Sequence, residues 1–144
     1  MKTKITIVVS IFTLTFFSIS NFSCKDKCED VAGTGGTFTI VAHPKHHTVP
    51  IISESLPGYP DSALVKFSPA ADFTATSHPA DYDLVLVADS GEDHVHIEDV
   101  KCGDYFIFMT GWDVSINQRV TGGIPYNVPV DAPSEIEIDV PVTE

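Results

Sequence analysis

Short segments in which apolar and polar residues alternate recur along the chain from residue 36 to its end. Alternation with a period of two places every second side chain on the same face of a β-strand, and this region lacks the 3.6-residue period of a helix. Gly, Pro, Asp and Asn separate the segments and are typical of turns. The pattern predicts seven strands, over residues 36–43, 63–67, 82–88, 94–100, 104–111, 119–128 and 135–142.

The alternation also predicts which face of three segments lies in the core. Segment 94–100 places Val95 and Ile97 on one face, so these side chains are expected inside and the other face at the surface. Segment 104–111 is apolar on both faces, so both are expected to be covered. Segment 135–142 has one apolar face, which carries Ile136, Ile138, Val140 and Val142.

The whole pattern predicts an all-β protein folded as a single seven-stranded Greek-key β-sandwich over residues 37–144. Ten prolines and nine glycines supply the turns, and 43% hydrophobic residues supply one core. Residues 43–62 contain four prolines and are predicted to form a long first loop. The Gly-Gly-Ile-Pro run at 122–125 indicates a bulge or an edge strand.

The first 23 residues have the pattern of an export signal. Residues 1–4 are positive, residues 5–19 are apolar, and residues 20–23 are mostly small and polar. The apolar run of about 15 residues is shorter than the roughly 20 that span a bilayer, which favours a signal peptide over the alternative of a membrane anchor helix. Residues 24–36 are polar, charged and Gly-rich, and they are predicted to form a flexible tether.

Ser23 and Cys24 at the end of this signal resemble the lipoprotein box of bacteria, in the looser form found in Bacteroidetes-type bacteria. The resemblance implies that Cys24 is acylated, becomes the first residue of the mature protein and holds it to a membrane. It also implies that the protein lies in the bacterial cell envelope, where the lipid anchors it to the periplasmic or the surface face of the outer membrane. Ordinary secretion is the alternative.

The cysteines are consistent with export. There are three, and if Cys24 carries lipid, Cys28 and Cys102 remain. Two cysteines in an oxidising compartment are expected to pair, and two free thiols are the alternative. A disulfide that closes a loop of about 74 residues stabilises the fold by up to roughly 4 kcal/mol.

The segment from His94 to Asp113 resembles a known fold family. It has an alternating strand, a turn with Gly103-Asp104-Tyr105, and a second strand that ends in Gly111-Trp112. This arrangement is similar to the hallmark of transthyretin-like sandwiches, which include carboxypeptidase regulatory-like and collagen-adhesin B-type domains. The resemblance implies that Gly103 adopts a φ that other residues resist and that Tyr105 returns the strand to the core. It implies that the inward apolar positions are Val95, Ile97 and Val100.

Charge and motif content exclude several classes of protein. Eight Lys+Arg stand against 20 Asp+Glu, a net charge of −12, which becomes −14 once Lys2 and Lys4 leave with the signal. A nucleic-acid partner is excluded because phosphate binding needs a basic patch. Disorder of the domain is excluded because only 19% of the residues are charged. No enzyme is predicted, since G-x-S-x-G, H-E-x-x-H, P-loop and G-x-G-x-x-G motifs are all lacking.

The six histidines are the one group of residues in the sequence that suggests a chemical site. Residues i and i+2 of a strand share a face, so His94, His96 and Glu98 form a row on the exposed face of their segment. Two imidazoles at this spacing bind one Zn²⁺ or Cu²⁺ ion when a third ligand lies near. The candidate ligands are His43, His46, His47, His94 and His96, with His78 as a further source of the third ligand.

Other interpretations of these polar residues stay open. The histidines also fit a solvated sandwich face without a ligand, or a pH-sensitive interaction surface. The acidic loop 89–93 offers oxygen ligands for Ca²⁺, and it equally suits a solvated hairpin turn.

The sequence therefore predicts a lipid-anchored, non-catalytic binding or structural module of the cell envelope. Its expected partners are the membrane, through the lipid, and an envelope protein or glycan. The first alternative is an envelope metal-binding protein that uses the histidine cluster for Zn or Cu. The second is an accessory domain of a larger envelope complex. Convergence of at least three imidazoles on one point would favour metal binding over the other two functions.

Overall fold

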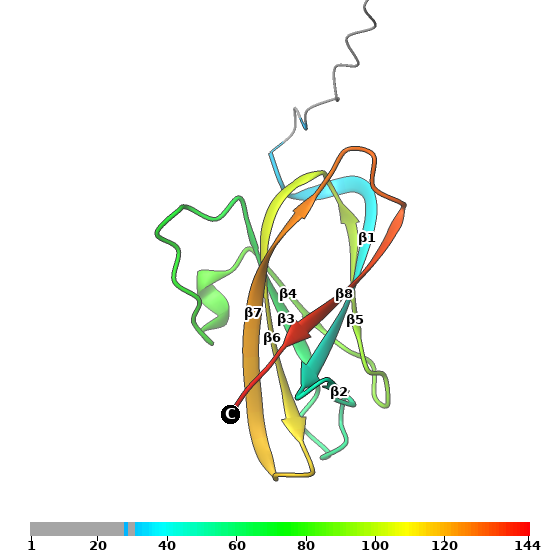
Figure 1. Ribbon diagram of the computed structural model, residues 1–144, viewed down its shortest axis with the longest axis vertical. Coiled ribbons are helices and arrows are strands. Elements are labelled where there is room, and N and C mark those ends of the chain that lie inside the picture. The colour runs from blue at the N-terminus through cyan, green and yellow to red at the C-terminus, as the bar shows by residue number, and fades with distance from the viewer. Residues whose placement is uncertain (1–27, 29–30) are drawn as a thin grey trace, which may run out of the picture.

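The computed structural model describes Cys28 and residues 31–144. The predicted signal peptide (1–23), the lipidation site Cys24 and most of the expected tether lie outside these residues. The described chain consists of strands and one short 3₁₀ helix, and it forms two facing sheets (Figure 1). In chain order the elements are β1 (Thr34–His46), β2 (Val49–Pro50), β3 (Ser62–Phe67), η1 (Pro79–Asp81), β4 (Leu84–Val87), β5 (Val95–Val100), β6 (Gly103–Asp113), β7 (Gln118–Val128) and β8 (Glu135–Pro141).

The all-β prediction is confirmed, and every one of the seven predicted segments forms a strand. The expected count of seven is one short, because β2 is an additional two-residue strand inside the predicted loop 43–62. That loop also begins too early: β1 continues to His46 and turns back through His47 and Thr48 into β2. The alternation ends near residue 43, before Pro44, but β1 continues because its residues up to Lys45 pair with the neighbouring strand β8.

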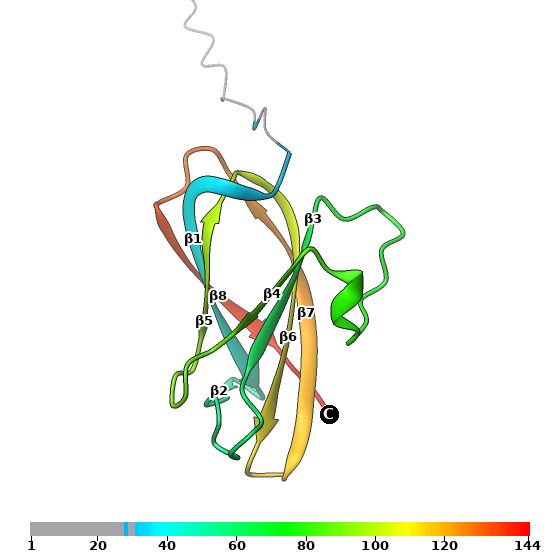
Figure 2. The ribbon, with the colours of Figure 1, turned by 180° about the vertical axis from the view of Figure 1, so that it is seen from behind.

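Each sheet has four strands. In the first, β1 pairs antiparallel with β5 and β2 and parallel with β8. The second has the antiparallel order β4-β3-β6-β7. Seen from both sides, the two sheets face each other, and β1 begins at the end opposite the β6–β7 turn (Figures 1 and 2). The Gly-Gly-Ile-Pro run lies on the edge strand β7, whose register with β6 is uninterrupted, so the edge strand was the right alternative.

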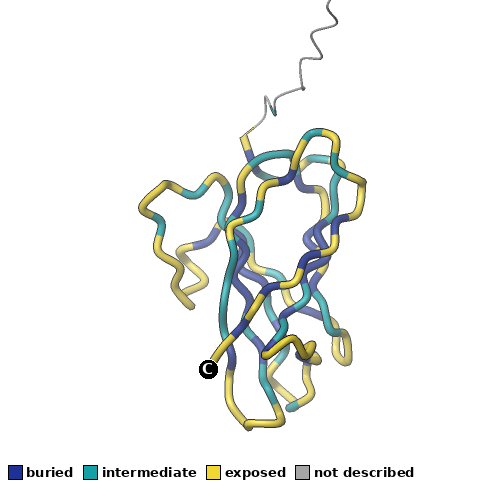
Figure 3. Tube along the Cα trace, in the orientation of Figure 1, coloured by how far each residue is buried: buried dark blue, intermediate teal, exposed yellow. Residues whose placement is uncertain are grey.

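The core lies between the sheets, where buried positions alternate with exposed ones along most strands (Figure 3). The predicted inward faces of segments 94–100 and 135–142 are confirmed, since all of their apolar residues belong to this core. β6 is covered on both faces, as predicted. Its outer face packs in a smaller apolar cluster beneath the loop that carries η1, formed by Leu64, Phe73, Tyr82, Phe106 and Phe108.

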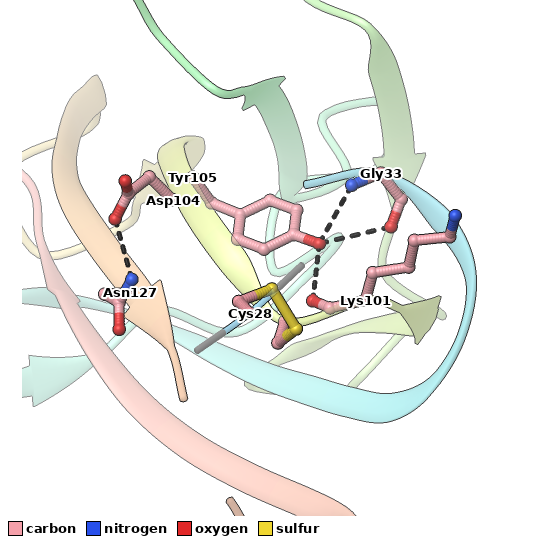
Figure 4. Close-up of a disulfide and its surroundings, with 7 residues drawn as sticks. Cys28, Gly33, Lys101, Asp104, Tyr105 and Asn127 are labelled. Carbon is pink, nitrogen blue, oxygen red and sulfur yellow. Dashed lines mark hydrogen bonds between the residues drawn. A yellow bond between two sulfur atoms is a disulfide. The ribbon is translucent and has the colours of Figure 1, made fainter. Parts of the chain in front are cut away.

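The residues just before β1 are fastened to the β5–β6 turn. Ala32 is buried, and the Tyr105 hydroxyl contacts the backbone of Gly33 (Figure 4). Cys28 and Cys102 are joined by a disulfide beside this contact (Figure 4). Gly103 has a φ of +133°, and a Cβ there would lie only 3.0 Å from Ala32, so glycine is required at this turn. The polar composition of 24–36 does not reveal this packing, which depends on Tyr105.

Candidate metal centres

The five candidate histidines separate into two clusters on opposite faces of the first sheet. His43 and His46 lie three residues apart on β1, and an odd separation along a strand points side chains to opposite faces. His43 joins His94 on the outer face, whereas His46 is buried and lies beside His47. Both clusters lie toward the end of β1 that is remote from the N-terminal chain (Figure 1).

The register between β1 and β5 assembles the outer cluster. Val41 pairs with His96 and Ala42 with Val95, so the next position brings His94 beside His43. The ring centroids of His43 and His94 are 5.4 Å apart, and those of His94 and His96 are 4.8 Å apart. His94 therefore contacts both other imidazoles. His94 and His96 lie on the outer face, where His94 is half-buried and His96 is exposed.

Asp93 orients the central imidazole. Nδ1 of His94 lies 2.9 Å from Oδ1 of Asp93, and Nδ1 of His43 lies 3.7 Å from the same oxygen. The hydrogen bond with His94 lowers the pKa of Asp93, and the charges of His43 and His94 add to this shift. An ionised Asp93 accepts the Nδ1 proton of His94, which leaves the other ring nitrogen of His94, Nε2, as an acceptor or a ligand.

The two nitrogens that face each other in this cluster are Nε2 of His94 and Nε2 of His96, 3.0 Å apart. In a tetrahedral Zn²⁺ site with bonds of about 2.0–2.1 Å, neighbouring ligand nitrogens are about 3.3 Å apart. Both histidines line a cleft of about 410 Å³ between the start of β5 and the edge strand β4. Carboxylates supply further donors to the same cleft, from Asp89, Glu92 and Glu98.

The inner cluster is built around His46, which is only 5% exposed. Its Nδ1 lies 2.6 Å from Oδ2 of Asp113 on β6, and its Nε2 lies 3.1 Å from Oε2 of Glu144. These hydrogen bonds, led by that of Asp113, raise the pKa of His46. The pKa of Asp113 falls to about 2, because Ser115 and His46 both donate hydrogen bonds to its carboxylate.

Sequence reasoning missed the acidic members of both clusters. The sequence places Asp93 in the acidic loop 89–93 and does not connect it with the histidine ligands. Asp113 and Glu144 gave no signal because they come close to His46 only in the folded chain. His78 belongs to neither cluster. It accepts a hydrogen bond from the Ala80 amide at the start of η1, on the loop outside the second sheet (Figure 2).

Comparison with known proteins gives no family for this chain: no protein-family model, curated protein or solved structure matches it. Among the residues that the structure describes, none forms a helix long and apolar enough to cross a membrane. The chemistry that the molecule supports is therefore inferred from the two histidine clusters and from the sequence.

Proposed function

We propose that this protein is an exported, lipid-anchored component of the bacterial cell envelope that binds a transition-metal ion, Zn²⁺ or Cu²⁺, through His94 and His96. One observation carries the proposal: the Nε2 atoms of the two rings are 3.0 Å apart at a cleft that also contains carboxylates. Imidazole nitrogen is a preferred ligand of both ions. The metal-binding alternative is thus favoured over a module without a ligand and over an accessory domain.

The surroundings of the pair have the organisation of a metal site. Asp93 accepts a hydrogen bond from Nδ1 of His94, and such an outer carboxylate fixes the tautomer and the ring direction of a metal-binding histidine. His43 contacts both Asp93 and His94, and its Nδ1, 3.7 Å from Oδ1 of Asp93, gives that carboxylate a second support. With 20 acidic against 8 basic residues in the chain, the field of the protein attracts cations to this surface.

The location rests on the N-terminal sequence. Removal of the signal peptide, residues 1–23, leaves Cys24 as the lipidated first residue, which anchors the mature protein to the outer membrane. The Cys28–Cys102 disulfide suits an oxidising compartment. The disulfide lies at one end of the sandwich and the two histidine clusters toward the other. The bound ion is then presented away from the membrane. Its use is delivery or sequestration of metal and needs no catalysis by the protein itself.

The same proposal assigns the domain to the transthyretin-like Greek-key sandwiches. The chain leaves the second sheet after β4, runs through the first sheet as β5 and returns as β6 beside β3, which supports a Greek-key connection. The Gly103 turn and the buried Tyr105 support the family hallmark on which the resemblance rests.

Calorimetric titration of Zn²⁺ and Cu²⁺ into the chain from Lys25 onward tests the metal site. The proposal predicts binding at about micromolar or lower dissociation constants, and loss of one equivalent in the His94→Gln/His96→Gln double variant. His78→Gln is the matched control, since His78 lies outside both clusters. Unchanged stoichiometry in the double variant, with a normal melting temperature, would contradict the proposal.

A further inference from the structure

We infer that His46, His47 and Glu144 form a second metal site, distinct from the pair His94–His96 and of a different design. One potential ligand atom from each of the three residues lies within 4.8 Å of the other two. Two imidazoles and one carboxylate are a ligand set that holds Zn²⁺ and leaves its fourth position open. The inference goes beyond the proposed function, since it uses other residues on the opposite face of β1.

Asp113 prepares His46 for this role. Its Oδ1 accepts hydrogen bonds from the amide and the hydroxyl of Ser115, at 2.7 and 2.6 Å, which fixes the carboxylate. The other oxygen, Oδ2, lies 2.6 Å from Nδ1 of His46. The hydrogen bond with Asp113 therefore occupies Nδ1 and leaves Nε2 of His46, the atom 3.1 Å from Glu144, to bind the ion.

The turn between β1 and β2 brings the third ligand close. His47 and Thr48 are the two residues between the paired ends of β1 and β2, and their φ values are 49° and 71°. Two-residue hairpins with positive φ at both positions strongly prefer Asn-Gly, so His and Thr at these positions are strained. The turn holds the His47 ring with its centroid 4.2 Å from that of His46.

All three ligands line a cavity of about 450 Å³ at the end of the sandwich where β1 ends. Four other lining residues are exposed large apolar side chains, namely Val49, Ile52, Val114 and Ile116, so an apolar patch surrounds the cavity. A cavity of this size, with apolar walls and a few polar groups at one point, fits a small organic molecule. The fourth ligand of the ion is accordingly a water molecule or the donor group of a small molecule with an apolar body.

Equilibrium dialysis of the chain from Lys25 onward against Co²⁺, a spectroscopic substitute for Zn²⁺, tests the second site. The expected stoichiometry is two ions per chain, falling to one in His47→Gln and in Glu144→Gln. It also falls to one in His94→Gln/His96→Gln, and to none when the substitutions at the two sites are combined. His47 and Glu144 are exposed, so these variants are expected to fold, and melting curves with His78→Gln as the control check this.

The outcomes separate the two sites. Full stoichiometry in His47→Gln and Glu144→Gln would overturn the second site and leave the proposed function intact. One ion in the wild type, lost only in His47→Gln or Glu144→Gln, would overturn the proposed function and support the second site. Binding of no ion would overturn both.

The cavity gives a second test in the His94→Gln/His96→Gln background, where Co²⁺ occupies only the second site. Octanohydroxamate, which has a long apolar tail, is expected to shift the visible Co²⁺ bands at concentrations at least about tenfold lower than acetohydroxamate. The reason is that its tail is transferred from water into the apolar cavity, which strengthens binding. Equal concentrations for the two compounds would overturn the role of the cavity.

Discussion

The hydroxyl of Tyr105 accepts a hydrogen bond from the amide of Gly33 at 3.1 Å, although the two residues are 72 positions apart in the chain. The same oxygen lies 3.1 Å from the carbonyl oxygen of Gly33 and donates at 2.7 Å to that of Lys101 (Figure 4). The phenol thus fastens the start of the domain to the β5–β6 turn. Its ring is only 1% exposed, so these backbone groups meet at a site that water does not reach freely.

Replacing Tyr105 by Phe is expected to lower the free energy of unfolding by about 1–3 kcal/mol, because the backbone groups around Gly33 lose their partner while the ring remains in the core. Denaturant unfolding measures the change. Tyr59→Phe is the matched control, since Tyr59 is 41% exposed and should change stability little. Equal stability of the two variants would show that the contact at Gly33 contributes nothing.

The disulfide is expected to stabilise the same region. Its cysteines are 74 residues apart, so removing the bond in Cys28→Ala/Cys102→Ala should cost up to roughly 4 kcal/mol of unfolding free energy. Proteolysis should then cut first near Ala32, which loses its covalent fastening. A thiol assay on denatured, unreduced protein checks the pairing itself: two free thiols in the chain from Lys25 onward would contradict it.

Asp61 predicts a pH dependence of stability. The side chain is buried at the start of β3, and burial raises its pKa to about 7 from 3.8, against a smaller lowering by the backbone of Trp112. The unfolded chain releases this proton near pH 4 and the folded chain only near pH 7. The folded state therefore loses stability as the pH rises through this interval, by about 1.4 kcal/mol for each pKa unit.

Asp61→Asn removes this titration while keeping the size of the side chain. The variant is expected to be more stable than the wild type by a few kcal/mol above pH 7, and the difference should vanish toward pH 4. Urea unfolding at several pH values gives the unfolding free energy of the wild type and of the variant as a function of pH. Subtracting one curve from the other cancels the contribution of the other carboxylates. Curves that run parallel from pH 4 to 8 would show that Asp61 is ionised in the folded state.

His46 predicts a second titration, which also lowers stability as the pH rises. The hydrogen bond with Asp113 is the main reason why its pKa is raised from 6.5. In the metal-free protein, the stabilisation that this hydrogen bond gives to the fold is therefore fully present below pH 6.5. That contribution is lost as the pH rises through the raised value. NMR of the imidazole nitrogens should show His46 titrating above the ordinary value of 6.5, and Asp113→Asn should lower its pKa. An unshifted pKa in that variant would contradict the role of Asp113.

The sequence predicted the strands because the alternation that marks a strand involves only residues that are close together in the chain. Alternation at Val95 and Ile97 gives the inward face directly, and the same period gives the outward pair His94 and His96. The contacts that the sequence did not predict join residues that are distant in the chain. His46 meets Asp113 across 67 residues and Glu144 across 98, and only the packing of three strands brings them together. The division of the histidines into two clusters has the same cause, since the sequence did not show that β1 extends to His46.

The most direct test of the account is anomalous diffraction at the zinc absorption edge from crystals of the chain grown with Zn²⁺. The central claim predicts an anomalous peak within about 2.0–2.1 Å of Nε2 of both His94 and His96, with Asp93 still bonded to Nδ1 of His94. Crystals in which His94 and His96 hold no ion while Zn²⁺ binds elsewhere, or in which no zinc is found, would contradict it.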